Sequence, residues 1–96
     1  MYINLDKLKE NDIFVWYKFE MPVIDLNNLK APNKLKFGVC KFNKLDSIPG
    51  KSIEFIKEES DEYFWNNSNI LMKCLLKMVQ CKKNNKYPER LQYASG

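Results

Sequence analysis

The sequence predicts an α+β fold in which an antiparallel meander of three or four strands packs on one C-terminal helix. Two observations carry this prediction. The first half of the chain holds short segments rich in aromatic and β-branched residues, separated by segments with Pro, Gly and Asn, as is typical of antiparallel strands. The second half holds one long segment with apolar residues at helical spacing. We expect a single domain over residues 1–96, because domains cluster near this length.

Four strands are expected, at about residues 1–5, 12–20, 34–43 and 51–58. The second strand is apolar on both alternating faces except at Lys18. It is therefore covered on both sides, or covered on one side with a functional face on the other. In the third strand the apolar residues change face between Val39 and Phe42, which predicts a bulge near Gly38. Residues 21–33 have no sustained period and are expected to form a connecting loop.

The one strong helix is expected at about residues 61–84. Ser60 or Asp61 can cap its N-terminus, although weak helix formers precede Ser68 and leave a later start open. After the helix, residues 87–95 keep enough apolar side chains to pack back on the body as a tail. The apolar positions at helical spacing are Phe64, Leu71, Cys74, Leu75 and Met78.

Composition narrows the range of functions. The 45% hydrophobic and 14% aromatic content argues against a disordered chain. The chain contains no His, which excludes Ser-His-Asp and Cys-His catalysis, a His general base and His-ligated metals. We therefore do not expect an enzyme, and an activity that uses Cys40 or a Lys as the nucleophile is the third choice among the functions considered.

The three cysteines are expected to be buried and free. Cys40, Cys74 and Cys81 form a poor disulfide framework, and we interpret them as small hydrophobic residues, with a reactive thiol as the alternative. Free thiols are typical of the reducing cytoplasm, and the first residues lack the plan of a secretion signal. The apolar runs are too short to span a bilayer, so we expect a cytoplasmic protein without a membrane partner.

Acidic residues gather just before and within the start of the expected helix. They lack the Gly and the spacing of a calcium loop, so we expect neither a metal site nor a cofactor. A solvated helix start explains them, and so does a surface that binds a partner. Two aromatic residues adjoin them, and Tyr and Trp are enriched in binding hot spots. The candidate partner-binding residues are therefore Glu58, Glu59, Asp61, Glu62, Tyr63 and Trp65.

Basic residues gather toward the end of the helix and the tail. The formal net charge of +4 for the whole chain thus hides the opposite charges of these two groups of residues. The basic segment could contact phosphates, although it matches no nucleic-acid-binding motif, and a solvated helix face explains it as well. Met72 and Met78 could serve a homodimer or the core. The basic residues are Lys73, Lys77, Lys82, Lys83, Lys86 and Arg90.

The two ends of the chain resemble a family of small bacterial proteins. The matching segments are Met1–Leu8, Phe14–Phe19, the helix with Lys73, Leu76, Lys77 and Lys82, then Tyr87–Arg90 and Tyr93–Ser95. They resemble the immunity proteins of contact-dependent growth inhibition and related polymorphic toxin systems. About half of the chain takes part in this resemblance.

The resemblance implies a protein that binds and neutralises a cognate toxin C-terminal domain in the cytoplasm. It would occlude the active site of the toxin or a surface that the toxin needs, without catalysis of its own. If the toxin is a nuclease, the acidic residues would complement its positive phosphate-binding surface. The alternative function is a small nucleic-acid-binding accessory protein that uses the basic C-terminal helix, although nucleic acid is the less expected partner.

Overall fold

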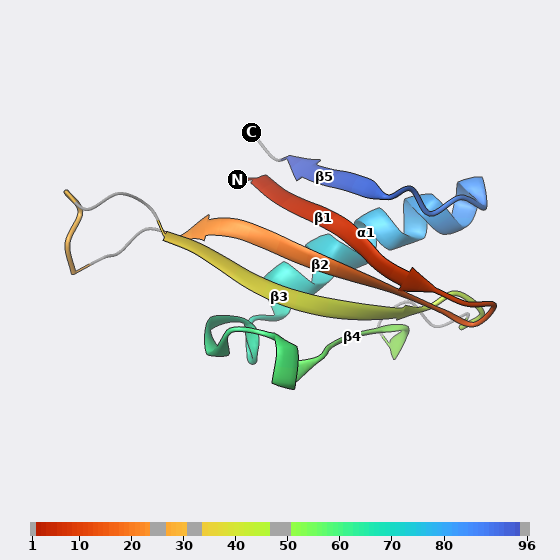
Figure 1. Ribbon diagram of the computed structural model, residues 1–96, viewed down its shortest axis with the longest axis horizontal. Helices are drawn as coiled ribbons and strands as arrows, with labels where there is room; N and C mark the ends of the chain where they lie inside the picture. Colours follow the sequence, from red (N-terminus) through yellow and green to blue (C-terminus); the bar gives the residue numbers. More distant parts are fainter. Residues whose placement is uncertain (1, 24–26, 31–33, 47–50, 95–96) are drawn as a thin grey trace.

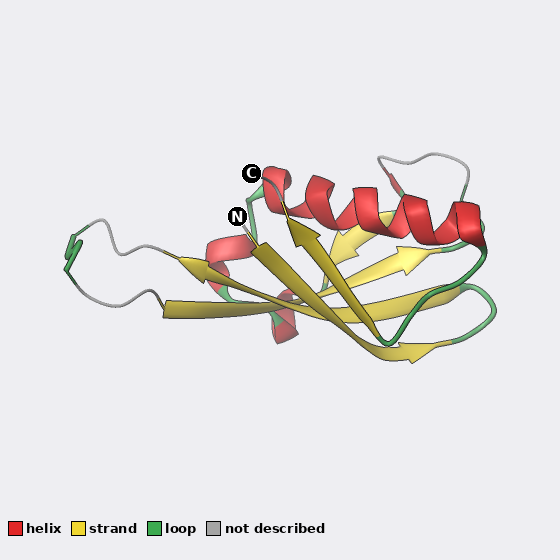
Figure 2. Ribbon diagram, turned by 90° about the horizontal axis from the view of Figure 1, so that it is seen from above, coloured by secondary structure: helices red, strands yellow, loops and turns green. Residues whose placement is uncertain are grey.

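A computed structural model describes residues 2–23, 27–30, 34–46 and 51–94. This part of the chain forms one antiparallel sheet with the strand order β4-β3-β2-β1-β5, and α1 packs on one of its faces (Figures 1 and 2). The predicted α+β class is confirmed, and β1 to β4 form the predicted meander. The elements are β1 (Tyr2–Glu10), β2 (Phe14–Val23), β3 (Lys34–Asn43), β4 (Ile53–Phe55), the 3-10 turns η2 (Lys57–Glu59) and η3 (Glu62–Phe64), α1 (Ser68–Asn84) and β5 (Arg90–Ala94).

The central strand β2 separates the two faces of the sheet. Its residues alternate because successive side chains in a strand point to opposite faces. The side that packs under α1 buries Val15, Tyr17, Phe19 and Met21. On the opposite face Phe14 and Trp16 are half-buried and Lys18 is exposed. The helix therefore covers this strand on one face only.

Strand β1 is longer than the predicted 1–5. It pairs with β2 as far as Glu10, and the irregularity in the sheet lies between Lys7 and Lys9. The bulge predicted near Gly38 is wrong, since β2 and β3 pair without a shift through that position. Gly38 instead leaves room for the ring of Phe19, because a Cβ at Gly38 would lie 2.8 Å from Cε1 of that ring.

The predicted boundaries around the helix need correction. Of the predicted strand 51–58, only Ile53–Phe55 forms a strand, which is β4. The predicted helix 61–84 begins only at Ser68. The side chain of Asn67 caps α1 by accepting from the N–H of Ile70 at 3.3 Å, whereas Asp61 caps η3. The weak helix formers before Ser68 explain the late start.

The predicted loop 21–33 is also too long, because β2 continues to Val23. Pro22 falls inside this strand and is exposed. Residues 24–26 and 31–33 of that loop lie outside the described residues, so the prediction is tested only in part.

The predicted tail 87–95 contains a fifth strand. β5 pairs antiparallel with β1, from Tyr2 opposite Ala94 to Asp6 opposite Arg90. Two side chains hold the segment before it. The hydroxyl of Tyr17 donates to the carbonyl of Pro88 at 2.6 Å, and Nζ of Lys7 donates to the carbonyl of Tyr87 at 2.8 Å. The tail thus completes the sheet rather than packing on its surface.

An aromatic cluster joins the sheet to the segment before α1. The ring of Phe19 lies 5.4 Å from that of Phe55 and 4.8 Å, edge to face, from that of Phe64. Phe19 and Phe64 are fully buried. Edge-to-face pairs add to the stabilisation that burial provides.

Replacing Gly38 with Ala is expected to destabilise the protein by about 1–3 kcal/mol, since overpacking a filled core has this cost. The new methyl group would overlap the ring of Phe19. Urea unfolding followed by Trp fluorescence measures the change. In a Phe19→Leu background the penalty of Gly38→Ala should shrink, and an equal penalty in both backgrounds would contradict this account.

A second prediction concerns the unfolding free energy at acidic pH. A hydrogen bond from Lys44 at 2.8 Å, with Lys7 also in contact, lowers the pKa of Glu10. Because the folded pKa is lowered, this stabilisation is present above the unfolded pKa of about 4.5 and is lost as the pH falls through the folded value. Glu10→Gln should therefore weaken the fall of the unfolding free energy between about pH 5 and pH 3. Glu59→Gln, an exposed carboxylate, is the control, and equal slopes in both variants would refute the role of Glu10.

Candidate functional site

The predicted partner-binding residues lie on the segment 58–65, which runs along the edge of β3 beyond the end of β4. The N–H of Ile56 donates to the carbonyl of Val39 at 2.8 Å, and the N–H of Asp61 donates to the carbonyl of Phe37 at 2.9 Å. Between them, Oγ of Ser60 accepts from the N–H of Val39 at 2.9 Å. These bonds satisfy edge groups of β3 and hold the segment in one conformation.

Two further residues anchor this segment. Phe64 inserts into the core from η3. Asp61 is half-buried, accepts from the N–H of Tyr63 at 3.1 Å, and forms an ion pair with Lys36 at 3.6 Å. Asp61, predicted as a partner-binding residue, thus also has a structural role in the segment.

The other five predicted residues are exposed on the same segment, 58–65, which we call the acidic segment. Glu58, Glu59 and Glu62 form no ion pair among the described residues. Tyr63 is 44% exposed and Trp65 is 40% exposed, although Nε1 of Trp65 donates to the carbonyl of Ser60 at 3.1 Å. The structure thus combines unpaired carboxylates and exposed rings on a fixed framework.

The cysteines lie in the core as predicted. Cys40, Cys74 and Cys81 are buried and free. A hydrogen bond with Cys40, together with burial, raises the pKa of the Cys74 thiol, and burial raises the pKa of the Cys81 thiol. Burial of all three residues agrees with their interpretation as small hydrophobic residues, and the raised pKa values of Cys74 and Cys81 keep these two thiols protonated.

The basic residues of α1 do not form one stripe. Lys73 and Lys77 are half-buried on one side of the helix. At roughly 100° per residue, Lys82 lies on the side of the helix opposite to Lys73. Nζ of Lys82 donates to the carbonyl of Asp46 at 2.8 Å. A nucleic acid that lay along one side of α1 would therefore not contact all of these lysines.

The sheet face away from α1 carries a set of aromatic rings and lysines. Nζ of Lys9 lies 4.4 Å from the ring centroid of Trp16, and Nζ of Lys41 lies 4.0 Å from that of Phe14. Nζ of Lys18 lies 4.9 Å from the ring of Phe37. Sequence reasoning allowed a functional face here but did not identify the set, because its members come from three strands. The only signal of this set in the sequence was that β2 has apolar residues on both of its faces.

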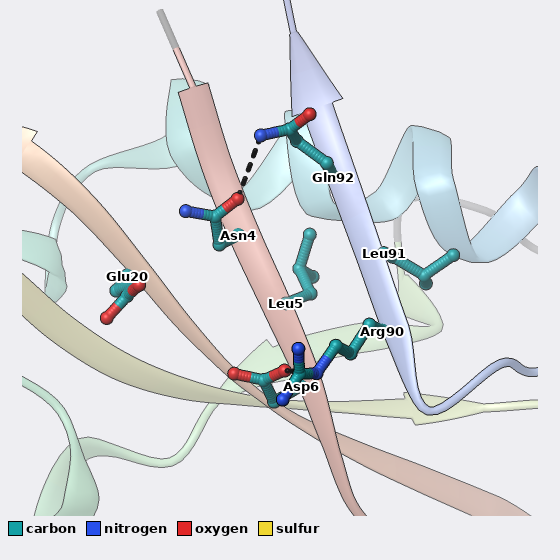
Figure 3. A pocket seen from close by; sticks show the side chains of 7 residues that line it. All are labelled: Asn4, Leu5, Asp6, Glu20, Arg90, Leu91 and Gln92. Atoms are coloured by element: carbon teal, nitrogen blue, oxygen red, sulfur yellow. Dashed lines mark hydrogen bonds and ion pairs between the residues drawn. The ribbon is translucent and has the colours of Figure 1, made fainter.

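A polar hollow of about 500 Å³ lies on this same face, across β1, β2 and β5 (Figure 3). Figure 3 shows that four of its side chains pair with one another. Nε2 of Gln92 donates to Oδ1 of Asn4 at 3.0 Å, and Nε of Arg90 lies 3.6 Å from a carboxylate oxygen of Asp6. Because these groups already satisfy each other, the hollow shows no set of free ligands for a small molecule.

A metal-binding cluster and a membrane-spanning helix are both absent from the described ranges. Within residues 2–23, 27–30, 34–46 and 51–94, no group of three or more Asp, Glu or Cys side chains is placed to hold a metal ion. In the same part of the chain, no helix has the length and apolar character needed to cross a membrane. Comparisons with protein-family models, curated proteins and solved structures found no match.

The burial of the thiols makes a direct prediction. In the native protein, Ellman's reagent at neutral pH should react with the three cysteines far more slowly than in urea, where all three should react. A single thiol that reacts at its unfolded rate under native conditions would contradict this account and restore a reactive cysteine.

Proposed function

We propose that this protein is an immunity protein that binds and neutralises a cognate toxin C-terminal domain in the cytoplasm. It acts by stoichiometric occlusion, without catalysis of its own. The observation that carries the proposal is the acidic segment, where Glu58, Glu59 and Glu62 lie exposed beside the rings of Tyr63 and Trp65. The resemblance at the two ends of the chain supports the same class of protein.

The framework of the acidic segment suits tight binding. Backbone hydrogen bonds to β3 and the buried ring of Phe64 already fix its conformation. A partner therefore has little loop entropy to overcome, which favours affinity. The carboxylates would speed association with a cationic surface, such as the phosphate-binding surface of a nuclease, and the rings of Tyr63 and Trp65 would anchor the complex.

The residues that carry the family resemblance have mainly structural roles in this fold. The carbonyls of Tyr87 and Pro88 accept the bonds that hold the tail, and Tyr93 packs on the core from β5. The acidic segment lies outside the resembling stretches. The residues that hold the fold and the proposed contact residues are therefore separate sets in this chain.

Mixing the protein with a toxin C-terminal domain encoded immediately upstream of its gene should give a one-to-one complex and protect cells that express the toxin. Charge reversal at three positions, Glu58→Lys, Glu59→Lys and Glu62→Lys, should slow association by about tenfold or more at low salt, because rim charges act mainly on the association rate. Stopped-flow fluorescence measures this rate.

The matched control reverses three exposed carboxylates elsewhere, Asp12→Lys, Glu54→Lys and Glu89→Lys, and so has the same net charge. It should associate much faster than the variant of the acidic segment. Equal rates for the two variants would remove the acidic segment from the interface. Failure to form a complex at micromolar concentrations, together with failure to protect cells, would refute the proposed function.

A further inference from the structure

Strand β5 forms one edge of the sheet, and α1 lies to one side of it (Figures 1 and 2). In the described part of the chain, its sole strand neighbour is β1. Edge strands are commonly protected by Pro, by bulges or by charged residues within the strand. β5 contains no Pro, and its only charged residue is Arg90 at one end.

The backbone groups that face outward from β5 follow from its pairing with β1. Leu5 lies opposite Leu91, and the N–H of Lys7 donates to the carbonyl of Glu89 at 2.8 Å, which continues the same register. Hydrogen-bonded pairs in an antiparallel ladder recur at every second residue. Leu91 and Tyr93 therefore bond to β1, and the N–H and C=O of Gln92 point away from it.

A hollow of about 370 Å³ lies between this edge and α1. Its apolar part comes from Leu76, which is 52% exposed, and from the half-buried Val79 and Tyr93. A smaller hollow of about 170 Å³ continues along the strand beside Leu91 and Cys81. Leu91 and Tyr93 are two residues apart, so the two hollows suit two side chains of an extended segment that point to the same face.

The walls of both hollows are basic. Lys77 lines both, Lys83 lines the larger one and Lys86 lines the smaller one. None of the three forms an ion pair with another described residue, and neither lining contains an Asp or a Glu. The groove thus combines unpaired strand groups, apolar hollows and uncompensated positive charge.

We propose that β5 binds an extended acidic segment of a partner protein, which adds to the sheet as a sixth strand in the groove beside α1. Two apolar side chains of the segment, two residues apart, enter the hollows at Tyr93 and Leu91. Flanking carboxylates pair with Lys77, Lys83 and Lys86. Strand addition of this kind draws affinity from main-chain hydrogen bonds and specificity from the side-chain pockets. The inference is independent of the proposed immunity function, because it uses a different surface.

Charge favours an acidic partner over a second copy of this chain at the same edge. Pairing β5 with β5 would bring two sets of Lys77, Lys83 and Lys86 together, and like charges close together are destabilising. An acidic strand meets the same lysines with the opposite sign.

The probe is a short fluorescein-labelled peptide in which two valines, two residues apart, are flanked by glutamates. Fluorescence anisotropy at low salt should show saturable binding, and amide hydrogen exchange should slow at Gln92. Gln92→Pro should weaken binding by about tenfold or more, because it removes the outward N–H while leaving the ladder to β1 intact. Gln92→Ala keeps the N–H and is the matched control, which should bind like the wild type.

Lys77→Glu combined with Lys83→Glu should also weaken binding by about tenfold or more. The control combines Lys51→Glu with Lys57→Glu, which flank β4 at the opposite edge of the sheet, and it should not weaken binding. Absence of peptide binding by the folded wild type would overturn the proposal. Equal binding by Gln92→Pro and Gln92→Ala would overturn strand addition. Sedimentation that shows a dimer sensitive to Gln92→Pro would assign the edge to a second copy and also overturn the acidic partner.

Discussion

The contact between the ring of Phe19 and the backbone at Gly38 is the constraint on which this architecture depends. Because Gly38 has no side chain, the ring lies against β3 and reaches Phe55 and Phe64. Through Phe64, the same contact anchors η3 in the acidic segment. A core contact in the middle of the sheet thereby helps to set the position of the surface segment that precedes the helix.

Polar anchors play the corresponding role at the other end of the sheet. Tyr17 and Lys7 donate to the carbonyls of Pro88 and Tyr87, which sit where the chain leaves α1 and returns to the sheet. Buried or half-buried carbonyls need such partners, since an unpaired polar group in the interior is costly. These two bonds direct the tail toward the free edge of β1, where β5 then pairs. Local helix and strand signals alone do not specify that return.

The sequence was sufficient for the fold class and the strongest elements, because the aromatic and β-branched residues of β2 and the helical spacing after Ser68 are local signals. It was insufficient where distant residues decide the outcome. β5 forms because β1 offers an edge, and Gly38 serves the ring of Phe19 rather than a bulge. The candidate site was predicted from acidic and aromatic residues that are neighbours in the sequence, and five of them are exposed. The ion pair of Asp61 could not be predicted in this way, because Lys36 is distant in the chain.

The pairing of β1 with β5 also has a consequence for biosynthesis. Tyr2 lies opposite Ala94, so strands from the two extremes of the sequence are neighbours in the sheet. Contacts of such long sequence separation are slow to form, and they cannot form before the last strand has left the ribosome. Until then β1 presents an unpaired edge, which is the usual template for misassembly between nascent chains. Completion of the sheet therefore waits until β5 has been made, well after β1.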